Sequence, residues 1–162
     1  MKRIFQNAED GRNVLPSNKR FALIGGCFDL IHVGHVHLLE HSASLEDLVV
    51  VAVLSDKYCK KYKDPQWPII SEQQRASMVA SIRYVDYVYI SDVSPSSPET
   101  LRLLMPSSVV FGVDSSNSDK LEKRLENIKE YSPKTSVQYL PRYSDEVVST
   151  TCIIHKIMNS KS

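Results

Sequence analysis

The fold of this chain is indicated most clearly by one stretch, Gly25-Gly26-Cys27-Phe28-Asp29-Leu30-Ile31-His32-Val33-Gly34-His35. It follows an apolar run, Phe21–Ile24, and precedes a segment with the apolar spacing of a helix. Three of the five glycines and two of the five histidines lie in this stretch. A strand that ends in glycines and leads into a helix lets backbone amides approach a phosphate. The stretch therefore predicts a phosphate-handling enzyme.

The composition is that of an ordinary globular domain. The chain has 162 residues, of which 42% are hydrophobic and 24% charged, so one domain with a substantial core is expected. A net charge of +1 argues against a nucleic-acid binder with a large basic surface. No apolar run approaches the roughly 18 residues that cross a bilayer, and the first ten residues lack the apolar core of a secretory signal. Neither nucleic acid nor a membrane is expected as a partner.

The cysteines favour a reducing compartment. There are three, Cys27, Cys59 and Cys152, and none forms a CxxC pair. An odd number without paired spacing predicts neither a disulfide framework nor a zinc site. We therefore expect a cytoplasmic protein with no dedicated metal cage.

Strands and helices alternate along the chain. Residues 1–19 are interpreted as an N-terminal extension and residues 20–158 as the functional domain, in which a polar, lysine-rich segment, 55–66, follows the second strand. The predicted strands are 21–27, 48–54, 87–90, 109–112 and 136–140, and the predicted helices are 36–44, 71–84, 99–105, 118–131 and 149–158. This order predicts an α/β, Rossmann-like fold with a five-stranded parallel sheet and helices on both faces. Its ligand would lie beyond the carboxyl ends of the strands.

Three segments together resemble a known family. Gly26–His35 resembles the GxFDxxHxGH signature of the HxGH nucleotidyltransferases, the cytidylyltransferase-like group. Arg75–Asp86 resembles the R…RYVD segment of glycerol-3-phosphate and phosphocholine or phosphoethanolamine cytidylyltransferases. Pro141-Arg142 with Ser149–Thr151 resembles the family's C-terminal PR…STT segment, and the resemblance covers about residues 20–158.

The resemblance implies a reaction and a site. A phosphorylated acceptor attacks the α-phosphorus of a nucleoside triphosphate in line, pyrophosphate leaves, and Mg²⁺ accompanies the nucleotide. His32 and His35 are predicted to donate hydrogen bonds to the α- and β-phosphates, and Lys63 to assist them. The predicted nucleotide-binding residues are Gly26, Cys27, Phe28, Gly34, Lys60, Arg83, Gly112, Asp114, Ser149, Thr150 and Thr151.

Several assignments remain open from the sequence. Which of Lys60, Lys61 and Lys63 contacts a phosphate is not decided. Asp29 either binds magnesium or holds the turn, whereas Asp86 is interpreted as ordering a helix-to-strand turn. Three further histidines are interpreted as structural: His37, His41 and His155. Ser71, with Gln74 three residues later, predicts a helix start with a capping box.

The acceptor is predicted less specifically than the reaction. The RYVD and PR…STT segments favour transfer of CMP from CTP to glycerol 3-phosphate. The GGCFD stretch and the loop Pro65–Ile70 favour the alternative, an adenylyltransferase that uses ATP and a sugar phosphate such as heptose phosphate, or FMN. Segment 143–148 lacks the family's glycine before the serine, which leaves an inactive nucleotide-binding module as a third possibility. Relatives are commonly homodimers, so a homodimer is expected.

Overall fold

The computed structural model describes residues 3–62, 66–112, 118–140, 143 and 149–160. In chain order the elements are β1 (Arg3–Phe5), α1 (Ala8–Val14), β2 (Phe21–Gly26), α2 (Val33–Leu45), β3 (Leu48–Leu54), α3 (Asp56–Tyr62), α4 (Glu72–Ser81), β4 (Tyr87–Ser91), α5 (Pro98–Leu104), β5 (Ser108–Gly112), α6 (Ser118–Tyr131), β6 (Ser136–Leu140) and α7 (Thr150–Asn159).

The strands form one sheet in the order β1-β4-β3-β2-β5-β6, and every neighbouring pair is parallel. The connections run outward from β2 in both directions, since β3 lies on one side of it and β5 on the other. The carboxyl end of β2 is therefore a topological switch point, where sheets of this kind bind ligands. The residue at that end is Gly26, the second glycine of the GGCFD stretch.

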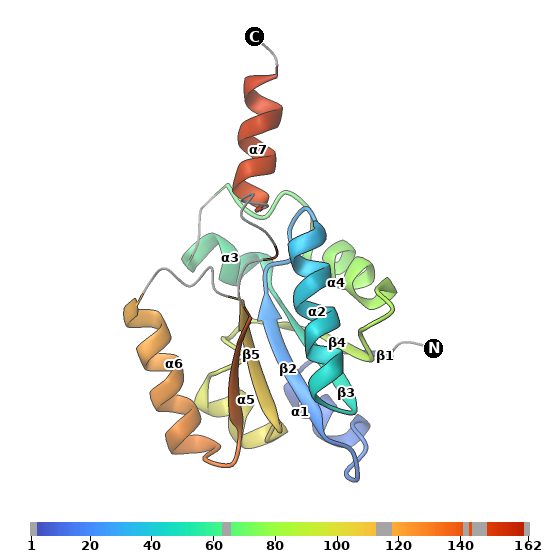
Figure 1. Ribbon diagram of the computed structural model, residues 1–162, viewed down its shortest axis with the longest axis vertical. Coiled ribbons are helices and arrows are strands. Elements are labelled where there is room, and N and C mark those ends of the chain that lie inside the picture. The colour runs from blue at the N-terminus through green and yellow to red at the C-terminus, as the bar shows by residue number, and fades with distance from the viewer. Residues whose placement is uncertain (1–2, 63–65, 113–117, 141–142, 144–148, 161–162) are drawn as a thin grey trace.

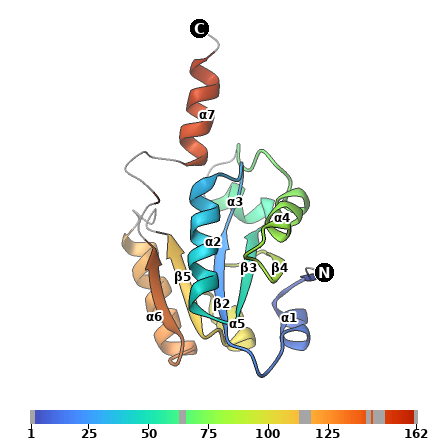
Figure 2. The ribbon, with the colours of Figure 1, turned by 45° about the vertical axis from the view of Figure 1, so that its right-hand side comes forward.

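Helices cover both faces of the sheet (Figures 1 and 2). On one face α2 and α4 bury Leu39 and Val79 against alternate residues of the central strands. On the other face α1, α5 and α6 pack against the remaining alternate residues. Strand β3, Leu-Val-Val-Val-Ala-Val-Leu, is apolar throughout because both of its faces are covered.

The predicted α/β fold with a parallel sheet is confirmed, and the sheet has one strand more than expected. That strand is β1, which lies in the predicted extension and pairs with β4 from Arg3↔Tyr87 to Phe5↔Tyr89. Helix α1 follows, with Asn7 as its N-cap, and Gly11 lies closely against Phe5. Helix α3 is a second addition, inside the lysine-rich segment 55–66.

Helix α7 extends beyond the carboxyl edge of the sheet (Figures 1 and 2), and none of its residues is buried. It touches the rest of the protein through its first turn, where Thr150 donates to a backbone carbonyl of the GGCFD turn. Within the described residues, no helix has the length and apolarity that a bilayer span requires.

Candidate active site

The turn between β2 and α2 is held in an uncommon backbone conformation. Phe28 and Leu30 have φ values of 54° and 47°, in the left-handed region that residues with a side chain rarely adopt. The buried Phe28 ring lies over Gly26, whose added Cβ would stand 3.0 Å from Phe28 Cε2. An added Cβ at Gly25 would stand 2.0 Å from Pro95 Cγ. Both glycines are therefore needed for close packing around the turn.

His32 and His35 form a reciprocal capping box at the start of α2. The backbone N–H of Gly34 donates to His32 Nδ1 at 3.2 Å, and that of His32 donates to His35 Nδ1 at 3.4 Å. The two rings stack with their centroids 4.0 Å apart. Because each Nδ1 accepts a hydrogen bond, each neutral imidazole carries its proton on Nε2. Both side chains thereby keep a fixed orientation, with Nε2 as the N–H donor.

Arg75 stabilises the turn through hydrogen bonds from its buried side chain. Its side chain is fully buried and makes three hydrogen bonds. Nε donates to the carbonyl of Ile70 at 2.8 Å, Nη1 donates to the carbonyl of Cys27, and Nη2 pairs with Asp56 Oδ1 at 2.6 Å. One guanidinium thus ties the turn, the loop before α4 and the start of α3 together. From the sequence, Arg75 was noted as a member of the R…RYVD segment and as a possible salt-bridge former, and the pair with Asp56 confirms the second role.

Asp29 holds the turn against the loop that precedes α4. Its carboxylate is almost fully buried and accepts hydrogen bonds from the backbone N–H groups of Ile69 at 2.8 Å and Ile70 at 3.1 Å. Of the two roles that the sequence left open, the structural one is the role these contacts describe.

Replacing Asp29 by asparagine is expected to lower the free energy of unfolding by about 1–3 kcal/mol. The asparagine amide offers one acceptor oxygen, so one of the two part-buried N–H groups would face an NH₂ group. Urea denaturation of the nucleotide-free protein without magnesium measures the change. An unchanged midpoint would show that the two hydrogen bonds contribute little.

The first turn of α7 completes the site. Ser149 caps this helix by accepting from the N–H of Cys152 at 3.2 Å. Thr150 Oγ1 donates to the carbonyl of Asp29 at 2.6 Å, which joins residues that are 121 positions apart. The structure therefore brings the STT segment directly against the GGCFD turn, as the resemblance to the nucleotidyltransferases implies.

The other predicted residues divide into three groups. Lys60, in the last turn of α3, and Gly112, at the end of β5, lie exposed at the carboxyl edge of the sheet with the turn. Arg83 is exposed beyond the C-terminal end of α4, before β4 begins, and so lies at the opposite edge. The structure does not bring it to the turn. Lys63 and Asp114 lie outside the described residues.

Hydrogen bonds in the structure test two further predictions from the sequence, the roles of Asp86 and Ser71. Asp86 accepts from the N–H of Val49 at 2.9 Å, which fixes the start of β3 beside β4 and confirms its ordering role. The capping box expected from Ser71 is wrong in its details. Ser71 is the N-cap of α4, yet its hydroxyl donates to Gln74 Oε1 at 3.1 Å and makes no hydrogen bond to the helix backbone.

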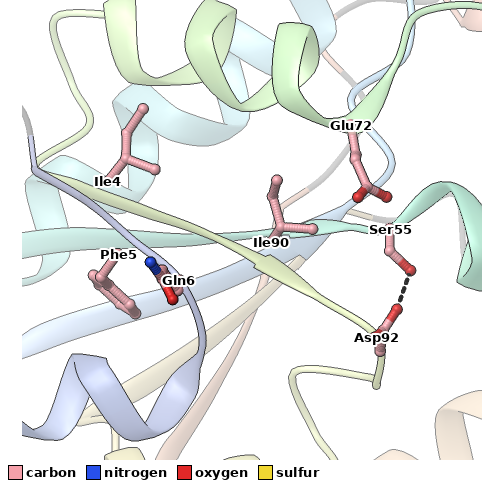
Figure 3. Close-up of a pocket in the computed structure, with 7 residues that line it drawn as sticks. All are labelled: Ile4, Phe5, Gln6, Ser55, Glu72, Ile90 and Asp92. Carbon is pink, nitrogen blue, oxygen red and sulfur yellow. Dashed lines mark hydrogen bonds between the residues drawn. The ribbon is translucent and has the colours of Figure 1, made fainter.

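A cavity of about 380 Å³ lies next to this site, and no sequence motif indicated it. Figure 3 shows it between α4 and the ends of β1, β3 and β4, with Glu72 pointing from α4 toward the strands. Ser55 donates to Asp92 at 2.6 Å across its floor, and Glu72 Oε2 accepts from the N–H of Asp56 at 2.7 Å. Because Asp56 pairs with Arg75, the cavity wall is connected to the turn through hydrogen bonds.

One tyrosine near the turn has a shifted pKa. Burial raises the pKa of Tyr58, and the nearby Arg124 partly offsets that rise. Tyr58 packs against the buried cluster of Cys27, Leu54 and Cys59 beneath the turn.

Fold and site together define an α/β nucleotide-binding enzyme with its candidate site at the carboxyl end of β2. Residues 23–156 match the family described as Cytidylyltransferase-like, and the chain belongs to this family. It is a nucleotidyltransferase.

Two curated relatives support this assignment, and one solved structure shares the fold. The FAD synthase of Thermococcus kodakarensis is 32% identical over 139 residues, covering 85% of this chain and 91% of the relative. The bifunctional protein HldE of Syntrophotalea carbinolica is 34% identical over 155 residues, which are 93% of this chain but only 30% of that protein. The pantoate-β-alanine ligase of Francisella tularensis shares the fold, with a TM-score of 0.65 at 14% identity over 99% of this chain and 78% of that one.

Proposed function

We propose that this enzyme transfers an adenylyl group from ATP to a small phosphorylated acceptor and releases pyrophosphate. The observation that carries the proposal is the similarity to an FAD synthase over 91% of that protein's length. FAD contains an AMP unit, so its synthesis from a flavin nucleotide requires an adenine nucleotide. This favours the adenylyltransferase alternative over transfer of CMP from CTP to glycerol 3-phosphate.

The chemistry asks for positioning and positive charge more than for a base, because the acceptor phosphate is already an anion. Backbone amides from Gly26 to Phe28 would line the path of the triphosphate. The Nε2–H groups of His32 and His35 would donate to its α- and β-phosphates, and these bonds would strengthen as charge moves toward pyrophosphate. Gly34 would leave room for the nucleotide at the start of α2.

The remaining contacts would come from three other segments. The N-terminus of α7, with Ser149, Thr150 and Thr151, offers hydroxyls and backbone amides of the kind that bind phosphate. Lys60 would add positive charge, as would Lys63. Mg²⁺ would arrive with the nucleotide, and triphosphate oxygens and water would supply most of its ligands. No cluster of three metal-binding side chains is found among the described residues.

FMN and a sugar phosphate are the two acceptor classes that the comparisons favour. The FAD synthase relative points to FMN, and HldE, through the resemblance to heptose-phosphate adenylyltransferases, points to a sugar phosphate. The chain spans only 30% of that HldE, so the similarity bears on one part of it. A homodimer remains a prediction from the resemblance, which light scattering would test.

A two-nucleotide, three-acceptor comparison tests the proposal. Pyrophosphate release is measured with ATP or CTP and with FMN, heptose 1-phosphate or glycerol 3-phosphate. We expect kcat/KM with ATP to exceed that with CTP by at least tenfold, with FMN or the sugar phosphate as acceptor. Equal or faster turnover with CTP and glycerol 3-phosphate would reverse the assignment. Absence of pyrophosphate release with every pair would favour the inactive nucleotide-binding module.

A further inference from the structure

We propose that Cys27 and Cys59 are an oxidisable pair whose disulfide reversibly switches off the phosphate-binding turn. Their Sγ atoms lie 3.1 Å apart, although the residues are 32 positions apart in the chain. A disulfide has an S–S length of about 2.05 Å, so bond formation requires an approach of about 1 Å. The sequence had predicted no disulfide, because spacing along the chain carries no sign of this pairing.

The position of the pair gives the bond a consequence. Cys27 lies between Gly26 and Phe28 in the turn, and its carbonyl is held by the buried Arg75. Cys59 lies on α3, one residue before Lys60, and its cluster with Leu54 is covered by Tyr58. A covalent bond would therefore pull α3 and the turn together. Cys152, on α7, is not a member of this cluster.

The two thiols differ in their access to solvent, which sets the order of the chemistry. Cys27 is 6% exposed, whereas Cys59 is fully buried. A small peroxide would oxidise the Cys27 thiol to a sulfenic acid and leave as water. The Cys59 thiol, deprotonated as it attacks, would then form the S–S bond and release the sulfenic oxygen as a second water. Two thiols lose two electrons and two protons in all, and hydrogen peroxide is reduced to two waters. A small dithiol then reduces the Cys27–Cys59 bond by thiol–disulfide exchange and is itself oxidised to a disulfide.

Displacement of the turn should inhibit the reaction. Misplacement of reacting groups by about 1 Å can reduce a rate by about 10²-fold. We expect the oxidised protein to lose at least 90% of its turnover and to regain it after reduction. This activity readout rests on the proposed adenylyl transfer, whereas formation of the bond does not.

The experiment treats the full chain with hydrogen peroxide and follows it by intact mass and by peptide mapping without reduction. A mass loss of about 2 Da, mapped to a peptide that links Cys27 to Cys59, is expected, together with loss of ATP-dependent pyrophosphate release. Dithiothreitol should restore both the mass and the activity. A higher oxidation product at Cys27, or a link through Cys152, would overturn the pairing.

Matched variants separate the bond from general oxidative damage. Under reducing conditions, Cys59→Ser and Cys59→Ala should be as active as the parent. After peroxide treatment they should show no inhibition that dithiothreitol reverses. Cys152→Ser should behave like the parent. Thermal unfolding identifies any variant that fails to fold. If the Cys59 variants do not fold, the comparison of the parent with Cys152→Ser tests the Cys27–Cys59 bond. A mapped Cys27–Cys59 bond with unchanged turnover would overturn the switch. An inactive reduced parent would overturn the proposed function and leave the mass result to judge the bond.

Discussion

Replacing His32 by asparagine is expected to lower kcat about 100-fold while leaving the thermal unfolding temperature close to that of the parent. Asparagine is a favourable N-cap residue, so its side-chain oxygen can accept from the N–H of Gly34 in place of His32 Nδ1. It cannot place an imidazole Nε2–H beside the triphosphate. Loss of one preorganised donor to developing negative charge costs about 10²–10³ in turnover.

At His35, too, one substitution can separate the capping role from the role as an imidazole donor. This residue is the third of the helix and closes the capping box by accepting from the N–H of His32. Glutamine serves in that position of natural capping boxes, so His35→Gln should keep the helix start and lose the imidazole Nε2–H. Turnover in steady-state pyrophosphate release measures the donor, and thermal unfolding measures the cap.

Two alanine variants act as controls for the histidine experiment. His32→Ala removes both the cap and the donor, so it should lose turnover and also about 1 kcal/mol of stability. His41→Ala, on the same helix but outside the capping box, should change neither. Near-normal turnover in His32→Asn would assign that histidine to capping alone and would remove it from the reaction.

The sequence predicted most of the fold because its strongest signals are local. The β-branched run of β3 and the glycines at the end of β2 each indicate their structure within a few residues. Strand β1 could not be predicted in the same way, since Arg3–Phe5 has only three residues and depends on pairing with β4. Helix α3 was missed because it has seven residues and a polar composition, and only Cys59 is buried.

Fewer features of the site than of the fold could be predicted, because the contacts in the site join residues that are distant in the sequence. His32 and His35 could be predicted because they sit in a spaced motif, but their mutual capping depends on backbone geometry. The role of Asp29 depends on two N–H groups 40 and 41 residues away, and backbone donors have no sequence signature. Arg83 was predicted to bind the nucleotide from the R…RYVD resemblance. The helix ends at Ser81, so Arg83 lies beyond it at the far edge.

Replacing Arg75 by methionine is expected to lower the free energy of unfolding by about 3–5 kcal/mol. Methionine fills similar space without a donor, so the buried carbonyls of Cys27 and Ile70 would lose their partner. Each unsatisfied group costs about 1–3 kcal/mol. Asp56 would lose its ion pair as well, although its partly exposed carboxylate can be rehydrated, which places the total below a simple sum.

Arg75→Lys and Arg83→Met are the matched comparisons. Lysine keeps the positive charge, so Arg75→Lys should lose less free energy of unfolding than Arg75→Met. The loss should still be measurable, because an ammonium group cannot donate in three directions at the fixed angles of a guanidinium. Arg83 is exposed, and its replacement should change stability by no more than about 0.5 kcal/mol. Urea denaturation of the three variants measures the order. A loss below about 1 kcal/mol in Arg75→Met would mean that the turn keeps its geometry without the guanidinium, since retained packing would then outweigh all three lost hydrogen bonds.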